Sequence, residues 1–537
     1  MRTARRPAIW DGGAPTTWVW LTFLSFLSLV LHLPFFGLPM ISDEGGYAYV
    51  AQRWFDGRGD LYHNIWVSRP QGIFVAYGLI FHTLGTSTEA IRIGAWLISI
   101  ATMLFVWLFA RDWAGRRAAM TATLLFAIIS GSPAIEGFTA NAEVFMALPA
   151  AAGAWLLLRA GRRGWDTRSL FVCGALASIA TQLKPSGVMM IPVFFAYVWF
   201  VGGSGRVMLQ RWSWITAGVV ISAAPAFIGG WMTGWHDFVF AAITYRLEFQ
   251  SSTTVGLHHH IAALTSLLIR FWPVLVLMTA VMILHFRQTR RWSDVYQWAD
   301  RLLGTTRLGI IARPILVLPR PVPRADGDVM LRLWMLGSLA GIAMGGDWWY
   351  HYFVQIIAPF VIWFGVLLLD VARFLSRRRR TVLALAVLLV FVAPYGVLRH
   401  GNAGAVSESI FNHTGYPTQA KVAEYIRDHT PREAPIFVAF DQAAIYYLAD
   451  RPSTYRYMYD QELRAIPNAE TDLVAMVESP SRPLYIIGTK QRAPFPDRGQ
   501  AFWNEVSEYY HLETMVHGVP IYKADTRRPM LLSDQIG

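Results

Sequence analysis

Residues 19–48 of the chain read VWLTFLSFLSLVLHLPFFGLPMISDEGGYA, an apolar run followed within a few residues by two adjacent acids. The run from Val19 to Phe36 contains no Asp, Glu, Lys or Arg. A helix of about 20 mostly apolar residues spans the hydrocarbon core of a bilayer. The run is longer than the apolar core of a typical signal peptide, and no clear small-x-small cleavage site follows it. We interpret it as the first membrane helix, with a cytoplasmic N-terminus.

The composition supports a membrane protein with many spans. Of 537 residues, 54% are hydrophobic and 15% are charged, which is too little charge to cover a soluble domain of this length. The net charge is +12 and there are 23 Trp. The arginines cluster in short loops between apolar runs, as the positive-inside rule describes, and Trp is typical of membrane interfaces. We therefore expect a bilayer as partner and no nucleic acid.

The basic clusters predict the topology. If all of them are cytoplasmic, an even number of crossings separates successive clusters. The apolar segment at about 71–86 then lies along the outer surface, and residues 39–89 form one large outer loop. A long inner loop follows at about 287–329, either a surface helix with a linker or a solvated connector. About eleven crossings are predicted, near 19–36, 90–110, 118–133, 143–159, 169–183, 187–201, 213–232, 262–286, 330–345, 352–375 and 381–397.

The composition changes near residue 400, where charge and Pro increase. Residues 436–440 and 484–488 have the pattern of buried strands, and residues 421–429 and 501–510 that of amphipathic helices. The fold class is therefore a polytopic α-helical membrane protein with a small α/β domain. We predict a membrane catalytic domain over 1–399 and an extracytoplasmic domain over 400–537.

Charged residues near the outer ends of the helices are the candidates for chemistry, because charge at membrane depth is costly. Asp43 and Glu44 follow the first helix, and either carboxylate suits a general base. The alternative is that the adjacent carboxylates cap the next helix, since Ser42 and Asp43 are good N-caps and acids favour helix N-termini. Arg69 closes the same loop segment, where it either binds a phosphate or extends to the membrane surface.

Further polar residues lie at later outer turns. Asn141 and Glu143 lie at the start of one membrane helix. Lys184 lies at the junction of two short membrane helices, where its ammonium group pairs with an anion or reaches water at the surface. Asp347, His351 and Tyr352 share another turn, where ordinary polar turn residues are the alternative. Three consecutive histidines, 258–260, do not share one helix face, so we assign no metal site to them. No phosphate-binding Gly loop is present, which disfavours a nucleotide donor.

At these residues the chain resembles the GT-C glycosyltransferases, in particular the lipid A aminoarabinose transferases and protein O-mannosyltransferases. The resemblance covers about residues 17–397. It rests on the order of these pieces: Asp43-Glu44 with Tyr47-Ala48, Arg69-Pro70, residues 139–143 (TANAE), residues 182–185 (QLKP), and His351-Tyr352-Phe353 with Gln355 and Pro359.

The resemblance implies an inverting transferase that takes a sugar from a polyprenyl-phosphate donor. Asp43 matches the family's base, with Glu44 as the alternative if the register differs. By position, Arg69 and Lys184 would hold the donor phosphate, with help from His351 and Tyr352. In the acceptor pocket the resemblance places Asn141, Glu143 and Asp347, and Glu143 could instead pair with Lys184.

The resemblance leaves several points open. Aminoarabinose transferases tend to have Lys where this chain has Arg69, and a guanidinium binds phosphate with a different geometry. A divalent metal cofactor stays open, because metal dependence varies within the superfamily. The acceptor is a lipid, a glycan or a protein, and by family analogy the compartment is the plasma (inner) membrane of a bacterium. The alternatives are a transporter or lipid flippase, and a catalytically inactive membrane scaffold.

Overall fold

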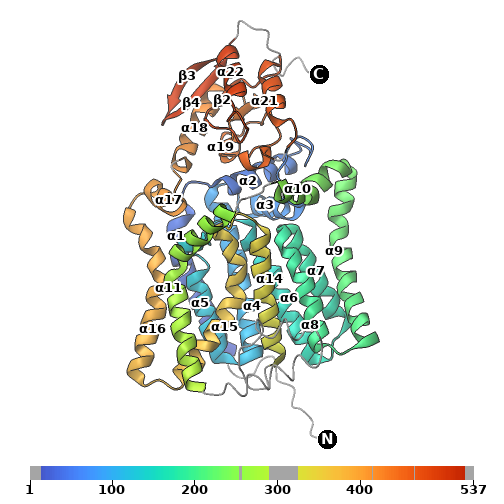
Figure 1. Ribbon diagram of the computed structural model, residues 1–537, viewed down its shortest axis with the longest axis vertical. Helices are drawn as coiled ribbons and strands as arrows, with labels where there is room; N and C mark the ends of the chain where they lie inside the picture. Colours follow the sequence, from blue (N-terminus) through green and yellow to red (C-terminus); the bar gives the residue numbers. More distant parts are fainter. Residues whose placement is uncertain (1–13, 253–256, 290–324, 414, 465, 526–537) are drawn as a thin grey trace.

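The computed structural model describes residues 14–252, 257–289, 325–413, 415–464 and 466–525. A bundle of long helices forms one end of the molecule and a small α/β domain forms the other (Figure 1). Two short helices, α2 (Ser42–Phe55) and α3 (Gln71–Thr83), lie between them. The predicted fold class is therefore confirmed, and most of the predicted inner loop, residues 290–324, lies outside the described residues.

The bundle is built from helices that match the predicted spans. They are α1 (Ala14–Phe36), α4 (Thr88–Ala114), α5 (Arg116–Ile129), α6 (Ala142–Arg163), α7 (Thr167–Leu183), α8 (Met190–Val201), α9 (Gly205–Val239), α11 (Leu257–Thr289), α14 (Ala325–Met344), α15 (Val354–Ala372) and α16 (Arg377–Val392). Eight spans in the described residues are long and apolar enough to cross a membrane by themselves. The other three helices, α5, α7 and α8, have 14, 17 and 12 residues.

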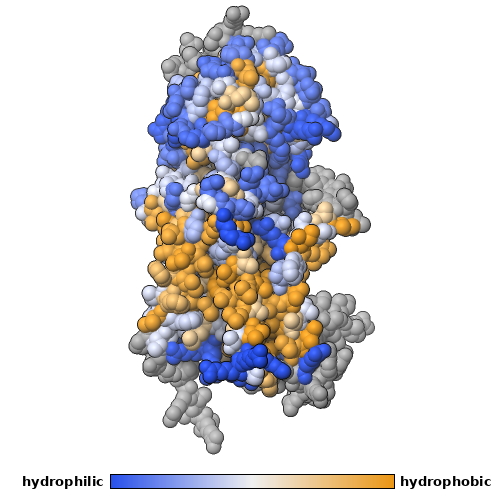
Figure 2. Space-filling model, turned by 90° about the vertical axis from the view of Figure 1, so that its left-hand side faces the viewer, coloured by the Kyte–Doolittle hydropathy of each residue, from blue (hydrophilic) through white to orange (hydrophobic). Residues whose placement is uncertain are grey.

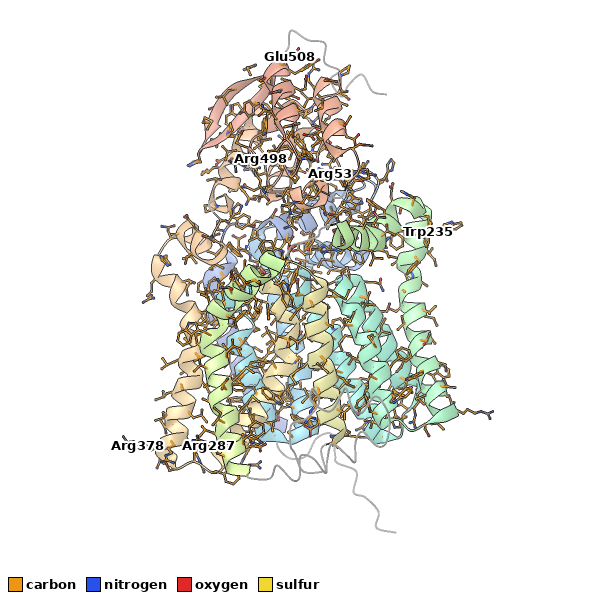
Figure 3. The ribbon with its side chains drawn as sticks, viewed as in Figure 1. Arg53, Trp235, Arg287, Arg378, Arg498 and Glu508 are labelled. Carbon is orange, nitrogen blue, oxygen red and sulfur yellow. The ribbon has the colours of Figure 1, made fainter. Side chains whose placement is uncertain are left out.

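An apolar belt covers the middle of the bundle on the face shown in Figure 2. Hydrophilic residues border it at the end opposite the α/β domain, and Arg287 and Arg378 lie at that end (Figure 3). Both arginines come from clusters that the topology assigns to one side of the membrane, so their shared position agrees with the assignment.

Short elements connect the outer ends of the helices. A 3-10 turn, η1 (Pro133–Ile135), follows α5, and η2 (Pro185–Met189) joins α7 to α8. A π-helical segment, η3 (Phe240–Thr244), and α10 (Tyr245–Ser252) follow α9, which is kinked at Gly234 (φ 135°). The turn η5 (Tyr350–Phe353) precedes α15, and η6 (Ala393–His400) follows α16.

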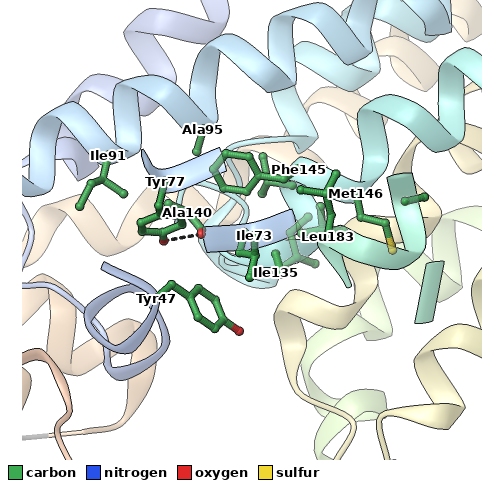
Figure 4. Close-up of a cluster of buried hydrophobic side chains, with 14 of the residues drawn as sticks. Tyr47, Ile73, Tyr77, Ile91, Ala95, Ile135, Ala140, Phe145, Met146 and Leu183 are labelled. Atoms are coloured by element: carbon green, nitrogen blue, oxygen red, sulfur yellow. Dashed lines mark hydrogen bonds between the residues drawn. The ribbon is translucent and has the colours of Figure 1, made fainter. Parts of the chain in front are cut away.

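Helix α3 fixes the outer loop to the bundle. Helix α3 contacts α4, α6 and α7, and its residues Ile73 and Tyr77 are buried. The hydroxyl of Tyr77 donates a hydrogen bond to the carbonyl of Ala140 at 2.8 Å (Figure 4). Gly72 meets the backbone of Gln182, where a Cβ would lie 2.7 Å from the carbonyl oxygen. The predicted surface segment at 71–86 is thus a helix packed on the ends of the bundle helices.

The C-terminal domain contains a four-stranded sheet in the order β1-β2-β4-β3. Its elements are α17 (Ala403–Phe411), α18 (Tyr416–His429), β1 (Ile436–Val438), α19 (Ala444–Ala449), α20 (Asp460–Leu463), α21 (Ala469–Glu478), β2 (Tyr485–Ile487), α22 (Gln500–Tyr509), β3 (Tyr510–Val516) and β4 (Val519–Ala524). Strands β1 and β2 pair in parallel, and the other two pairs are antiparallel. Both predicted strands and both predicted helices are present, and the β3–β4 hairpin is an addition.

The C-terminal domain packs directly on helix α2. At Gly45 an added Cβ would lie 2.2 Å from the Cα of Ala444 in α19. At Gly46 it would lie 1.6 Å from the hydroxyl oxygen of Tyr459. Two consecutive glycines therefore allow a close approach that any side chain would block, and this contact lies one turn from Asp43.

Candidate active site

Glu44 has a structural role. Its two carboxylate oxygens accept hydrogen bonds from Arg92 Nε (3.0 Å) and Nη2 (2.7 Å), from the amide of Ala140 (2.8 Å) and from the amide of Ile41 (3.2 Å). Both charged side chains are fully buried. A carboxylate that is held in this way cannot accept a proton from a substrate without losing its partners. This network favours Asp43 over Glu44 as the base, and the alternative of Glu44 as the base stays a prediction.

Arg92 ties this carboxylate to the end of α1. Its guanidinium donates to the carbonyls of Phe35, Leu38 and Pro39 at 2.9, 2.7 and 3.0 Å. The N-cap of α2 is Ile41 and not Ser42 or Asp43, but the Glu44 carboxylate bonds back to the Ile41 amide, so one of the two adjacent acids does cap the helix. This arrangement fixes the first turn of α2 and leaves the side chain of Asp43 outside it.

Asp43 is the accessible member of the acidic pair. Its side chain is 32% exposed, and its Oδ2 lies 3.8 Å from Nε2 of His351. Helix α2 positions it at the helix N-terminus, where a carboxylate is favoured. Asp43 thus faces a histidine of η5, the turn that precedes α15.

Arg69 lies beside the same helix. Its Nε donates to the hydroxyl of Tyr47 at 2.9 Å, and Nη1 donates to the carbonyl of Ser68 at 3.0 Å. Tyr47 is one helical turn after Asp43, so this bond brings the guanidinium to the base candidate. Burial raises the pKa of Tyr47 and keeps its hydroxyl protonated.

Lys184 pairs with Glu143. The two form a hydrogen-bonded ion pair that is almost wholly buried, and the Lys184 ammonium lies 3.8 Å from the centroid of the Tyr352 ring. The ammonium is thus neutralised on one side and faces an aromatic ring on another. Of the two predicted roles for Glu143, the structure contains the pairing with Lys184.

His351 joins the acids of the site. Its Nδ1 lies 2.9 Å from Oε2 of Glu136, and its Nε2 lies 3.8 Å from both Asp43 and Glu143. Glu136 is a residue that the sequence analysis did not select. It follows the turn η1 in the left-handed conformation (φ 54°), which aims its side chain across the bundle.

Two other predicted residues lie at the edge of this cluster. Asn141 is buried and donates to Thr139 Oγ1 at 2.9 Å, and its amide oxygen has no hydrogen-bond partner among the described residues. Asp347 is half-buried in the turn before η5, five positions before Tyr352. In the described part of the chain, no group of three or more His, Cys, Asp or Glu is placed to hold a metal ion. The side chains of residues 258–260 lie outside it.

A separate cavity of about 940 Å³ lies between residues 235–248 and the C-terminal domain. Tyr455, Arg456 and Tyr457 line it, and the Arg456 guanidinium already pairs with Asp237 at 3.4 Å. None of Asp43, Arg69, Lys184 or His351 lines this cavity. The charged cluster is therefore a distinct feature, in which two fixed cations and one accessible carboxylate suit chemistry on a phosphate-bearing substrate.

Comparisons with known proteins bear on the fold and the family. Residues 68–228, which include Arg69, Glu143 and Lys184, match the family model for dolichyl-phosphate-mannose-protein mannosyltransferases. None of the curated protein sequences matches the chain significantly.

Solved structures share the fold. One is ArnT from Cupriavidus metallidurans in the apo state (TM-score 0.61, 13% identity, 95% of this chain and 98% of that chain covered). The same enzyme bound to undecaprenyl phosphate gives a TM-score of 0.59 at 13% identity, with 96% and 99% covered. The oligosaccharyltransferase of Archaeoglobus fulgidus tethered to an acceptor peptide gives 0.53 at 12% identity, with 97% and 76% covered. These findings confirm the resemblance to GT-C glycosyltransferases.

Proposed function

We propose that this membrane glycosyltransferase with the GT-C fold transfers a sugar from a polyprenyl-phosphate donor to an acceptor at the extracytoplasmic surface. The observation that carries the proposal is the convergence of Asp43, Arg69, Lys184 and His351 at the outer end of the bundle. One accessible carboxylate next to two cations supplies a base for the acceptor and positive charge for the leaving phosphate.

Asp43 acts as the general base. It accepts the proton of the acceptor nucleophile as the nucleophile attacks the anomeric carbon. The bond from that carbon to the phosphate oxygen breaks on the opposite face, and its electron pair leaves with the lipid phosphate. The configuration at the anomeric carbon is therefore inverted.

Arg69 and Lys184 stabilise the charge that grows on the leaving phosphate. Both are held in place before the reaction, Arg69 by Tyr47 and Ser68 and Lys184 by Glu143. Fixed charges in a site with little water act strongly and need no reorganisation during the reaction. The fork of Arg69 can bind two phosphate oxygens at once.

The remaining residues orient these groups. His351, held by Glu136, lies next to Asp43, and Tyr352 covers the ammonium of Lys184. The amide oxygen of Asn141 lacks a partner in the described residues and suits an acceptor hydroxyl, with Asp347 at the same edge.

The donor class has support from a protein of the same fold, since ArnT crystallised with undecaprenyl phosphate. The archaeal oligosaccharyltransferase structure carries a tethered acceptor peptide, which is a precedent for a protein acceptor on this fold. We place the chain in the plasma (inner) membrane, with a cytoplasmic N-terminus, a catalytic domain over 1–399 and an extracytoplasmic domain over 400–537.

The test is transfer of labelled sugar from a panel of polyprenyl-phosphate donors by the purified protein. We expect Asp43→Asn to lose at least about a hundredfold in rate while staying folded, because a positioned base contributes about 10²–10⁴. The matched control is Asp60→Asn, at an exposed acid in the same outer loop. Equal rates for wild type and Asp43→Asn would refute Asp43 as the base. Movement of donor across a liposome membrane without transfer would favour a flippase instead.

A further inference from the structure

The short segment Tyr459–Glu462 of the C-terminal domain contacts the neighbours of both Asp43 and Arg69. The hydroxyl of Tyr459 donates to the carbonyl of Ser42 at 3.1 Å. Oε1 of Glu462 accepts from the amide of Ser68 at 3.1 Å. One helical turn of the C-terminal domain thus touches the residue before the base candidate and the residue before the phosphate-binding arginine.

Ser68 transmits the contact to Arg69. Its carbonyl accepts from Nη1 of Arg69 itself, and its hydroxyl and carbonyl face the guanidinium of Arg246 in α10 at 3.3 and 3.4 Å. The carbonyl of Arg69 accepts from the hydroxyl of Tyr62 at 2.9 Å. Ser68, whose carbonyl holds the Arg69 side chain, is therefore itself held at its amide by Glu462.

Tyr459 contacts the first turn of α2, as Glu462 contacts Ser68. Its hydroxyl occupies the space where a Cβ on Gly46 would lie. The bond to Ser42 therefore holds the first turn of α2, which carries Asp43, at close range.

The segment is anchored in its own domain. Asp460 pairs with Lys490, which follows strand β2, and the amide of Glu462 donates to the carbonyl of Tyr459 at 3.1 Å. A connection therefore runs from the sheet, through α20, to the two catalytic candidates.

Glu462 is also unusual by itself. Only 5% of the residue is exposed, and its Oε2 has no hydrogen-bond partner among the described residues. A buried carboxyl group is costly, so its presence at this position calls for a specific role. Its bond to the Ser68 amide supplies one.

We propose that Tyr459 and Glu462 are positioning residues, through which the C-terminal domain holds Asp43 and Arg69 at the spacing that transfer requires. The inference rests on the proposed function and extends it to the second domain. Glu462 acts through Arg69 on the donor phosphate, and Tyr459 acts through the first turn of α2 on the base.

A double-mutant cycle tests Glu462, with binding of undecaprenyl phosphate to the full chain as the readout. We expect Glu462→Leu to weaken binding about tenfold in the wild-type background and less than about twofold in an Arg69→Ala background, because coupled residues are not additive. Glu462→Gln keeps an oxygen for the Ser68 amide and should bind within about threefold of wild type. The control is Tyr447→Phe, which removes another bond between the domains, to the carbonyl of Thr86, and should leave binding unchanged.

Tyr459→Phe gives a second, independent reading. It should lower kcat for transfer and leave undecaprenyl phosphate binding unchanged, whereas Glu462→Leu should weaken undecaprenyl phosphate binding. Equal losses for Glu462→Leu in both backgrounds, or the same loss for Tyr447→Phe, would overturn the inference and leave the proposed function intact. A wild-type protein that binds no undecaprenyl phosphate would overturn both.

Discussion

Substitutions at the adjacent acids Asp43 and Glu44 are expected to have opposite effects. A change at Glu44 should lower stability, whereas a change at Asp43 should lower transfer activity and leave stability unchanged. Replacing Glu44 with Gln keeps the shape of the side chain and removes its charge. All four hydrogen bonds that reach the carboxylate come from N–H groups, so the new amide nitrogen must face donors. The buried guanidinium of Arg92 also loses its counter-charge, and breaking one side of a buried pair costs about 3–5 kcal/mol.

This magnitude can be measured as a melting temperature. With roughly 2.1 cal/mol/K of unfolding entropy per residue, a chain of 537 residues should melt roughly 3–4 °C lower in the Glu44→Gln variant. The assay is thermal unfolding in detergent at neutral pH, followed by transfer activity of the folded fraction. Asp43→Asn is the matched comparison, because that side chain is partly exposed and has no such network, so its melting temperature should stay at the wild-type value.

Two outcomes would refute this reasoning. A Glu44→Gln variant that melts with the wild type would show that the carboxylate does not hold the loop. A variant that melts with the wild type and also loses transfer would make Glu44 the base.

Three further outcomes are expected. Burial raises the pKa of Glu462 to about 8 from an ordinary value of 4.5, so the folded protein binds more protons than the unfolded chain between these values. Stability should therefore fall as pH rises from about 5 to 8, by on the order of 4 kcal/mol. In melting curves, Glu462→Gln should weaken this dependence of stability on pH. An unchanged dependence in the variant would contradict its assignment to Glu462. Gly46→Ala should loosen the C-terminal domain, because the new methyl group meets Tyr459, and limited proteolysis should then cut between the domains faster than in the wild type; equal cleavage rates would contradict the close contact. Lys184→Met alone should destabilise the protein by leaving Glu143 buried without its partner, whereas Lys184→Met with Glu143→Leu should recover stability but not transfer. Recovery of transfer in the double variant would remove Lys184 from the mechanism.

Hydropathy and charge predicted the bundle because each membrane helix is specified locally. A run such as Val19–Phe36 must be helical in lipid whatever surrounds it. The positions of Asp43, Arg69 and Lys184 were visible for a related reason, since charge at membrane depth stands out against its apolar neighbours. The hairpin β3–β4 was missed because its turn, His517-Gly518, has two positive φ values but lacks the Asn-Gly or Asp-Gly pair that marks such a turn in a sequence.

Distant partners could not be predicted. Nothing near Glu44 indicates that Arg92 satisfies it, so the two acids of the pair looked equivalent. Glu136 reaches His351 because of one left-handed residue after a 3-10 turn, which hydrophobic periodicity does not reveal. The bond between Ser68 and Glu462 spans 394 positions, and only the folded chain brings these residues together.

That long separation has a consequence for biogenesis. A nascent chain grows by about 5–20 residues per second. Arg92 lies 48 positions after Glu44 and is therefore synthesised several seconds later. Glu462 is synthesised on the order of a minute after Ser68. During that interval the bundle can enter the membrane before the C-terminal domain contacts the loop that bears Arg69. We expect nascent chains halted before residue 459 to be inserted and stable yet unable to process donor lipid.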